Sequence, residues 1–147
     1  MLGSLGNAYG DLGDAVKKRE LLERGLEILQ RYYGPDYVEV ARTLANLGNA
    51  YGDLGNPAKK KELQERAIII LERQYGLDHV QVASVLASLS NALGALGNPI
   101  KKKELLERAL AIKERHYGPD RAEVAKTLCS LGNAYGVLDD LDKFKAA

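Results

Sequence analysis

Residues 47–54 read LGNAYGDL, and this phrase decides the fold because it returns at a constant interval along the chain. Its copies lie 42 residues apart and start at Leu5, Leu47, Leu89 and Leu131. The third copy is altered to LSNALGAL. Residues 41–82 and 83–124 share about 26 identities in 42 aligned positions. Self-similarity of this extent is typical of stacked structural repeats, in which each unit contacts only its neighbours.

The repeated phrase lies in a segment with the periodicity of an amphipathic helix, since apolar residues are spaced by four and three positions. These residues are Val40, Leu44, Leu47, Tyr51 and Leu54. Asp36 precedes the segment and Glu39 follows three residues later, which predicts a capping box at the helix start. We therefore expect a first helix, helix A, in each unit, and a glycine such as Gly55 should end it.

A second helix, helix B, is expected to follow directly. Asn56-Pro57 can supply its N-cap and first-turn proline, and Gly76 its end. Ala, Leu, Glu, Lys and Arg prevail in the composition and Trp is absent, which favours packed helices. The predicted fold is all-α, a right-handed solenoid of antiparallel helix A/helix B pairs with about three and a half repeats.

The single repeat domain, residues 1–147, is expected to comprise units at approximately 1–36, 37–78, 79–120 and 121–147. Its first and last units are incomplete. The chain should open inside a helix A and close in the first part of a helix B.

Charge and composition exclude several classes of partner. The 21 basic and 20 acidic residues leave a net charge of +1, so no overall field attracts nucleic acid or an anionic membrane. The longest apolar run, residues 67–71, is far shorter than the roughly 20 residues of a membrane-spanning helix. One cysteine permits no internal disulfide, and no basic stretch leads into an apolar run at the N-terminus. We therefore expect a cytoplasmic protein.

The spacing of the packing residues resembles the tetratricopeptide repeat signature over the whole chain. It is carried here by Leu44, Leu47, Gly48, Tyr51, Gly55 and Ala67. The 42-residue period and the stretch from Arg108 to Arg115 are similar to the variant in kinesin light chains and related bacterial arrays. Two features depart from the signature: a lysine such as Lys60 stands early in helix B where a small residue is usual, and no proline closes helix B.

This resemblance implies that a peptide binds in a concave groove lined by helices A. The groove residues that we expect to contact it are Asn7, Asn49, Asn91, Asn133, Arg42, Asp53, Ser84 and Lys126, with Gly52, Gly94 and Gly136 beside them. A row of side-chain amides can both donate to and accept from the backbone of an extended chain. Alternatively, each Asn bonds to a neighbouring helix or to water and only sets the register of the repeats.

Lysine runs open each helix B, at residues 17–19, 59–61 and 101–103. They could form a basic ridge for an acidic partner. We favour a solvated edge, in which Lys61–Glu65 and Lys103–Glu107 form pairs and the middle lysine lays its stem over an adjacent helix. The glycines inside helices A are expected to permit close approach of neighbouring helices.

Catalytic and metal-binding patterns are missing from the sequence. His79 and His116 occupy different places in the repeat, and neither has a partner at metal-ligand spacing. Cys129 is expected to be a small groove or core residue. We therefore expect no enzyme activity, no metal and no cofactor.

Solenoids normally end in polar capping repeats, and this sequence shows none. Matching apolar faces at the two ends would let copies associate head to tail into a homo-oligomer. The residues expected to do so are Leu2, Leu5, Tyr9, Leu131, Tyr135, Leu138, Leu141 and Phe144. The predicted function is a non-catalytic protein-interaction scaffold that binds an extended or helical peptide, and the alternative is a self-assembling structural module.

Overall fold

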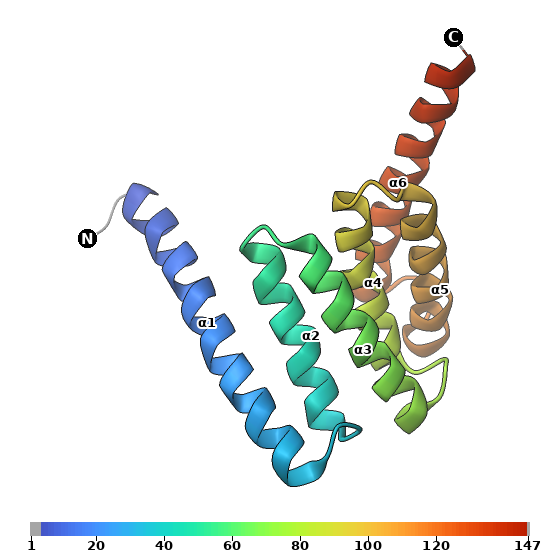
Figure 1. Ribbon diagram of the computed structural model, residues 1–147. Coiled ribbons are helices and arrows are strands. Elements are labelled where there is room, and N and C mark those ends of the chain that lie inside the picture. The colour runs from blue at the N-terminus through green and yellow to red at the C-terminus, as the bar shows by residue number, and fades with distance from the viewer. Residues whose placement is uncertain (1–3, 147) are drawn as a thin grey trace. The chain divides into compact units, whose positions relative to one another are not determined.

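The computed structural model describes the backbone of residues 4–146 and the side chains of residues 13–141, and the described residues form helices without a strand (Figure 1). The helices are α1 (Ser4–Tyr33), α2 (Val38–Asp53), α3 (Pro57–Tyr75), α4 (Val80–Ala95), α5 (Pro99–Tyr117) and α6 (Ala122–Ala146). The expected all-α helical repeat fold is confirmed, whereas its right-handed course stays a prediction. The chain divides into two compact units, residues 1–70 and 71–147.

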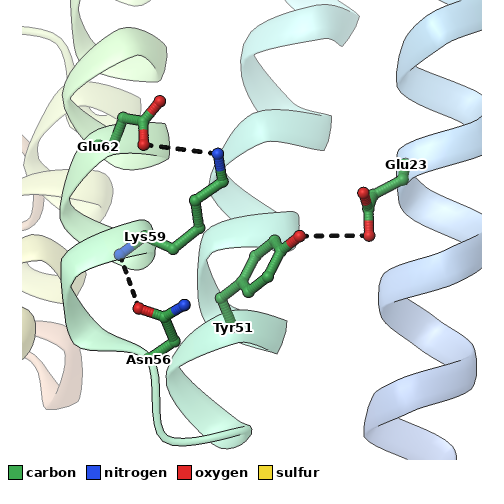
Figure 2. A network of polar contacts seen from close by, with 5 residues as sticks. All are labelled: Glu23, Tyr51, Asn56, Lys59 and Glu62. Atoms are coloured by element: carbon green, nitrogen blue, oxygen red, sulfur yellow. Dashed lines mark hydrogen bonds and ion pairs between the residues drawn. The ribbon is translucent and has the colours of Figure 1, made fainter.

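The turns between α2 and α3 and between α4 and α5 follow the signals in the sequence. Gly55 has φ +83° and Gly97 has φ +79°, a left-handed conformation that costs glycine little. Asn56 Oδ1 then accepts a hydrogen bond from the backbone N–H of Lys59 at 3.1 Å (Figure 2). Asn98 caps α5 in the same way through the N–H of Lys101 at 3.2 Å. These caps confirm the predicted starts of helix B.

The first and last helices differ from the expected helix pairs. Helix α1 runs through residues 4–33 and α6 through residues 122–146 without the turn that the other units have (Figure 1). The expectation that each would contain a helix A followed by a separate helix B is therefore wrong. The position of Pro57 holds Ala15 in α1 and Leu141 in α6, so nothing there removes a backbone N–H or clashes with the preceding turn.

The starts of helices A also differ from the prediction. Helix α2 begins one residue later than a capping Asp36 would require: its N-cap is Tyr37, which makes no side-chain cap. His79 caps α4 instead, and its Nδ1 accepts a hydrogen bond from the N–H of Gln81 at 3.1 Å. Asp78 forms an ion pair with Arg115 at 3.3 Å. The predicted capping boxes are therefore wrong for α2 and α4, because the aspartates lie one position outside the cap.

The core of each unit comes from the apolar stripes read in the sequence. In residues 1–70, the buried side chains of α2 and α3 include Val40, Ala41, Leu44, Leu47, Leu63, Ala67 and Ile68. In residues 71–147, Leu106 of α5 packs with Leu131 and Ala134 of α6, and Leu110 covers this cluster. Burial of such side chains contributes roughly 1.5–3 kcal/mol each and holds adjacent helices together.

Candidate peptide-binding face

The predicted groove residues lie on the same side of each helix A, and we call this side the A face. On α2 it carries Arg42, Asn49, Gly52 and Asp53, on α4 Ser84, Asn91 and Gly94, and on α6 Lys126, Asn133 and Gly136. Asn7 belongs to α1, but its side chain lies outside the described residues. Cys129 of α6 is exposed as a free thiol.

Asn49 serves the structure of its own unit. Its Oδ1 accepts a hydrogen bond from Gln64 Nε2 of α3 at 3.0 Å, and the same Gln64 amide also donates to the carbonyl oxygen of Ala45 at 3.2 Å. Gln64 is completely buried. A buried amide is costly unless it is hydrogen-bonded, so Asn49 stabilises the pairing of α2 with α3. At this position the structural interpretation of the asparagine is the better one.

The asparagines of residues 71–147 have a different environment from Asn49. Asn91 of α4 and Asn133 of α6 are both exposed, and neither makes a hydrogen bond with another residue in the part of the chain that the structure describes. Leu106 occupies the repeat position of Gln64, so no buried amide is present there to pair with Asn91. The amides of Asn91 and Asn133 are therefore accessible to a partner.

Two lysines reach the A face from helices B. A Cβ atom placed on Gly52 would lie 2.8 Å from Lys60 Cδ, and one on Gly94 would lie 3.1 Å from Lys102 Cδ. Each lysine stem thus crosses a glycine of the preceding helix A, which confirms the expected position of the middle lysine in runs 59–61 and 101–103. Burial lowers the pKa of Lys60, and the nearby carboxylate of Asp53 partly offsets this effect. That these glycines leave room for a lysine, and so bring an ammonium group onto the A face, was not predicted from the sequence.

Two further lysines of these runs form the expected pairs. Lys61 Nζ lies 3.1 Å from Glu65 and Lys103 Nζ lies 3.7 Å from Glu107, both one helical turn away. On the A face itself, Arg42 is held by Glu39 at 2.9 Å. Surface pairs of this kind contribute only about 0.3–0.5 kcal/mol, but they leave these charges partly neutralised.

The residues expected at open ends are described only in part. Leu2 and the side chains of Leu5, Tyr9 and Phe144 lie outside the described residues. Leu131 is buried against Leu106 and is not part of an exposed surface. Leu138 is half-buried, while Tyr135 and Leu141 are 50% and 43% exposed.

The side chains of residues 13–141 contain no group of three or more His, Cys, Asp or Glu residues that could hold a metal ion. Among the described residues, no helix is apolar over enough of its length to cross a membrane.

Comparison with known proteins identifies the family. One tetratricopeptide repeat model matches residues 1–59, and another matches residues 40–81 and 82–123. The second model alone covers more than half of the 147 residues, so the chain belongs to the tetratricopeptide repeat family. Repeats of this family generally mediate protein–protein interaction and are generally non-catalytic. No curated protein matches the sequence.

Solved structures with the same fold include kinesin light chain-like proteins. BtubC (BKLC) from P. vanneervenii is 26% identical with a TM-score of 0.80, and the match covers 91% of this chain and 54% of that one. The nearly identical TPR-like repeats of a putative kinesin light chain from Podosopora anserina are 22% identical to this chain, with a TM-score of 0.82. The match covers 95% of this chain and 66% of that one. A point variant of the P. anserina repeats is also 22% identical, with a TM-score of 0.81 and the same coverage. The chain thus spans between about half and two thirds of these proteins.

Proposed function

We propose that the chain is a protein-interaction scaffold and that the A face of residues 71–147 binds an extended polypeptide. The observation that carries this proposal is the pair of exposed amides, Asn91 and Asn133, which make no hydrogen bond within the described residues. Each amide can donate to a carbonyl oxygen and accept from an N–H group of the bound backbone. Two asparagines inside helices also cost helix propensity, which favours a role outside the fold itself.

Charged and hydroxyl groups flank these amides. Lys102 crosses Gly94 beside Asn91, and Ser84 and Lys126 line one cavity between α4 and α6. A polypeptide along this face would therefore meet hydrogen-bond donors and positive charge together. Backbone recognition by the amides would tolerate different side chains, whereas the lysines would favour acidic sequences.

The test uses peptides selected from a random displayed library against the full chain, with affinities measured by fluorescence anisotropy. The double variant Asn91→Ala/Asn133→Ala is expected to weaken binding at least tenfold, because two amide hydrogen bonds contribute about 1 kcal/mol each. Lys101→Ala is the matched control, since Lys101 is an exposed polar residue at the start of α5. Selected peptides that bind the double variant and the parent chain equally would contradict the proposal.

A second candidate function is self-association through α6. The exposed apolar residues Val137 and Leu141 are spaced one helical turn apart on the same side of α6, and helix α6 continues past them without a turn. Association of two copies would remove this apolar surface from water.

Light scattering after size exclusion, over a range of protein concentrations, tests this second candidate. The mass is expected to rise with concentration, and Val137→Glu/Leu141→Glu should return it to that of a monomer. The control Leu77→Glu changes an exposed leucine outside α6. A monomeric mass at all concentrations would exclude self-association.

A further inference from the structure

Lys113 interrupts the repeat at a position that is apolar elsewhere. Alignment at the 42-residue interval places it with Leu71 and Leu29 of the preceding units. Leu71 is only 2% exposed. A lysine at this position brings a positive charge close to the core, which is costly unless the charge is paired or hydrogen-bonded.

The surroundings of Lys113 hold its ammonium group in place. Lys113 Nζ donates a hydrogen bond to Thr127 Oγ1 at 3.2 Å, and Thr127 is 2% exposed. Partial burial lowers the pKa of Lys113, the charge of Lys126 lowers it further, and Glu123 acts in the opposite direction. Two cationic side chains that disfavour each other's charge are thus directed at the same place.

That place is a cavity of about 220 Å³, open to solvent on one side and bordered by three helices of residues 71–147. It lies between α4, the last turns of α5 and the first turns of α6, and is lined by Ser84, Lys113, Tyr117, Ala122, Glu123 and Lys126. The start of α6 adds the positive end of a helix dipole. The hydroxyl of Tyr117 can donate a further hydrogen bond, whereas that of Ser84 donates to the carbonyl oxygen of Val80 at 3.2 Å.

Neither lysine of this cavity has a carboxylate partner. No ion pair of Lys113 or Lys126 occurs within the described residues. Lys126 differs in this from Arg42, the residue at the same repeat position in α2. Arg42 binds Glu39 at 2.9 Å, whereas Lys126 does not bind the corresponding Glu123. The cavity therefore contains two unpaired ammonium groups and one carboxylate.

We propose that this cavity binds the carboxylate of an acidic side chain from a bound polypeptide. Two positive charges and one negative charge leave a net charge of +1 around the cavity, which matches a single carboxylate better than a doubly charged phosphate. Its volume is below the roughly 300 Å³ at which pockets for small-molecule ligands begin, but is sufficient for one side chain. The inference rests on the proposed function for the source of the carboxylate, but not for the site itself.

The site is tested first with acetate as the probe. Sodium acetate replaces sodium chloride at constant ionic strength, and the backbone amide resonances of Ala122, Glu123 and Thr127 are followed by NMR. Saturable shifts are expected, and Lys113→Leu should weaken the apparent affinity at least tenfold. This variant restores the residue of the equivalent units, so it is expected to fold. Lys101→Leu is the matched control and should leave the affinity unchanged.

Three outcomes of the acetate experiment would overturn the proposal. They are shifts that do not saturate, saturable shifts that persist unchanged in both Lys113→Leu and Lys126→Gln, and tighter binding of inorganic phosphate than of acetate. The last outcome would show that the cavity selects a different anion.

A second experiment separates this site from the proposed function. Acidic residues of a selected peptide are replaced one at a time by their amides, and affinities are measured for the parent chain and for Lys113→Leu. One replacement is expected to weaken binding to the parent chain at least fivefold and to have no effect in Lys113→Leu. Peptide binding without such coupling would contradict the site but not the scaffold, whereas saturable acetate binding with no peptide binding would contradict the scaffold but not the site.

Discussion

The hydroxyl of Tyr51 in α2 donates a hydrogen bond to Glu23 Oε1 in α1 at 3.3 Å (Figure 2). Tyr135 in α6 makes the same bond to Glu107 in α5 at 2.9 Å, again across 28 residues. A cation lies over each phenol ring, Arg19 at 5.9 Å and Lys103 at 5.1 Å from the centroid. This contact joins the helix B segment of one repeat to helix A of the next. Its repetition shows that these two helices pack in the same register within residues 1–70 and within residues 71–147.

Tyr51→Phe is expected to reduce the free energy of unfolding by about 0.5–1 kcal/mol, because it removes one charge-assisted hydrogen bond at a partly solvated site. Urea denaturation measures the change. Tyr32→Phe is the control, since Tyr32 is 75% exposed. Equal losses in both variants would show that the bond to Glu23 contributes nothing.

The pKa of Tyr135 is raised above the ordinary value of 10.0, mainly because its hydroxyl donates to Glu107 and also because the Glu107 charge opposes a phenolate. Any stabilisation linked to this group is present below pH 10 and is lost as the pH rises through the raised pKa. Glu107→Gln is expected to lower the pKa of Tyr135 towards 10.0. NMR titration of the phenol carbon measures it, and an unchanged value in Glu107→Gln would contradict the assignment.

The effects of substitutions at Gly48 and Gln64 on stability are expected to be coupled. A Cβ atom at Gly48 would lie 2.8 Å from Gln64 Cγ, and the equivalent pair in the next unit is Ser90 and Leu106. Gly48→Ser alone should therefore destabilise the chain by about 1–3 kcal/mol through overpacking. The double variant Gly48→Ser/Gln64→Leu should recover at least half of this loss. A double-mutant cycle by denaturation measures the coupling, and simple additivity would contradict it.

Ala15→Pro is expected to break α1. A proline inside a straight helix costs about 3 kcal/mol, but with this substitution residues 13–15 would match the turn at Gly55-Asn56-Pro57 in having a glycine first and a proline third. We expect Gly13 to adopt positive φ and the helical NOEs across residues 12–16 to disappear. Ala15→Ser is the control and should keep the helix intact. Continuous helical NOEs in the proline variant would show that more than the missing proline holds α1 straight.

Lys113→Leu is expected to raise the free energy of unfolding at pH 7 by about 1 kcal/mol, because a leucine buries more apolar surface at this position than lysine does. The pKa of Lys113 is lowered in the fold from 10.5, so the unfolded chain binds the proton more tightly. The parent chain should therefore gain stability relative to the variant as the pH rises through the lowered pKa towards 10.5. Denaturation at several pH values measures the difference, and a gap that does not narrow would argue against a charged, partly buried Lys113.

Much of the architecture could be predicted from the sequence because it depends on local interactions that repeat at a fixed interval. The glycines at positive φ, the capping asparagines and the apolar stripes act within one or two helical turns. The identity of the repeat follows from the same signals. The uninterrupted course of α1 and α6 could also have been predicted, since Ala15 and Leu141 replace the prolines, but the strong similarity of the repeats concealed this difference.

The sequence by itself determined the helical class, the repeat family, the helix boundaries near Gly55 and Gly97 and the side of each helix A that faces outward, because these depend on short-range preferences and periodicity. Only the tertiary structure decided which outward residues have partners. Asn49 and Asn91 occupy the same place in the repeat, yet Gln64 binds the first and Leu106 cannot bind the second. The cavity beside Lys113 likewise required three helices to be placed together, since no periodicity in one helix specifies which charges from other helices will meet.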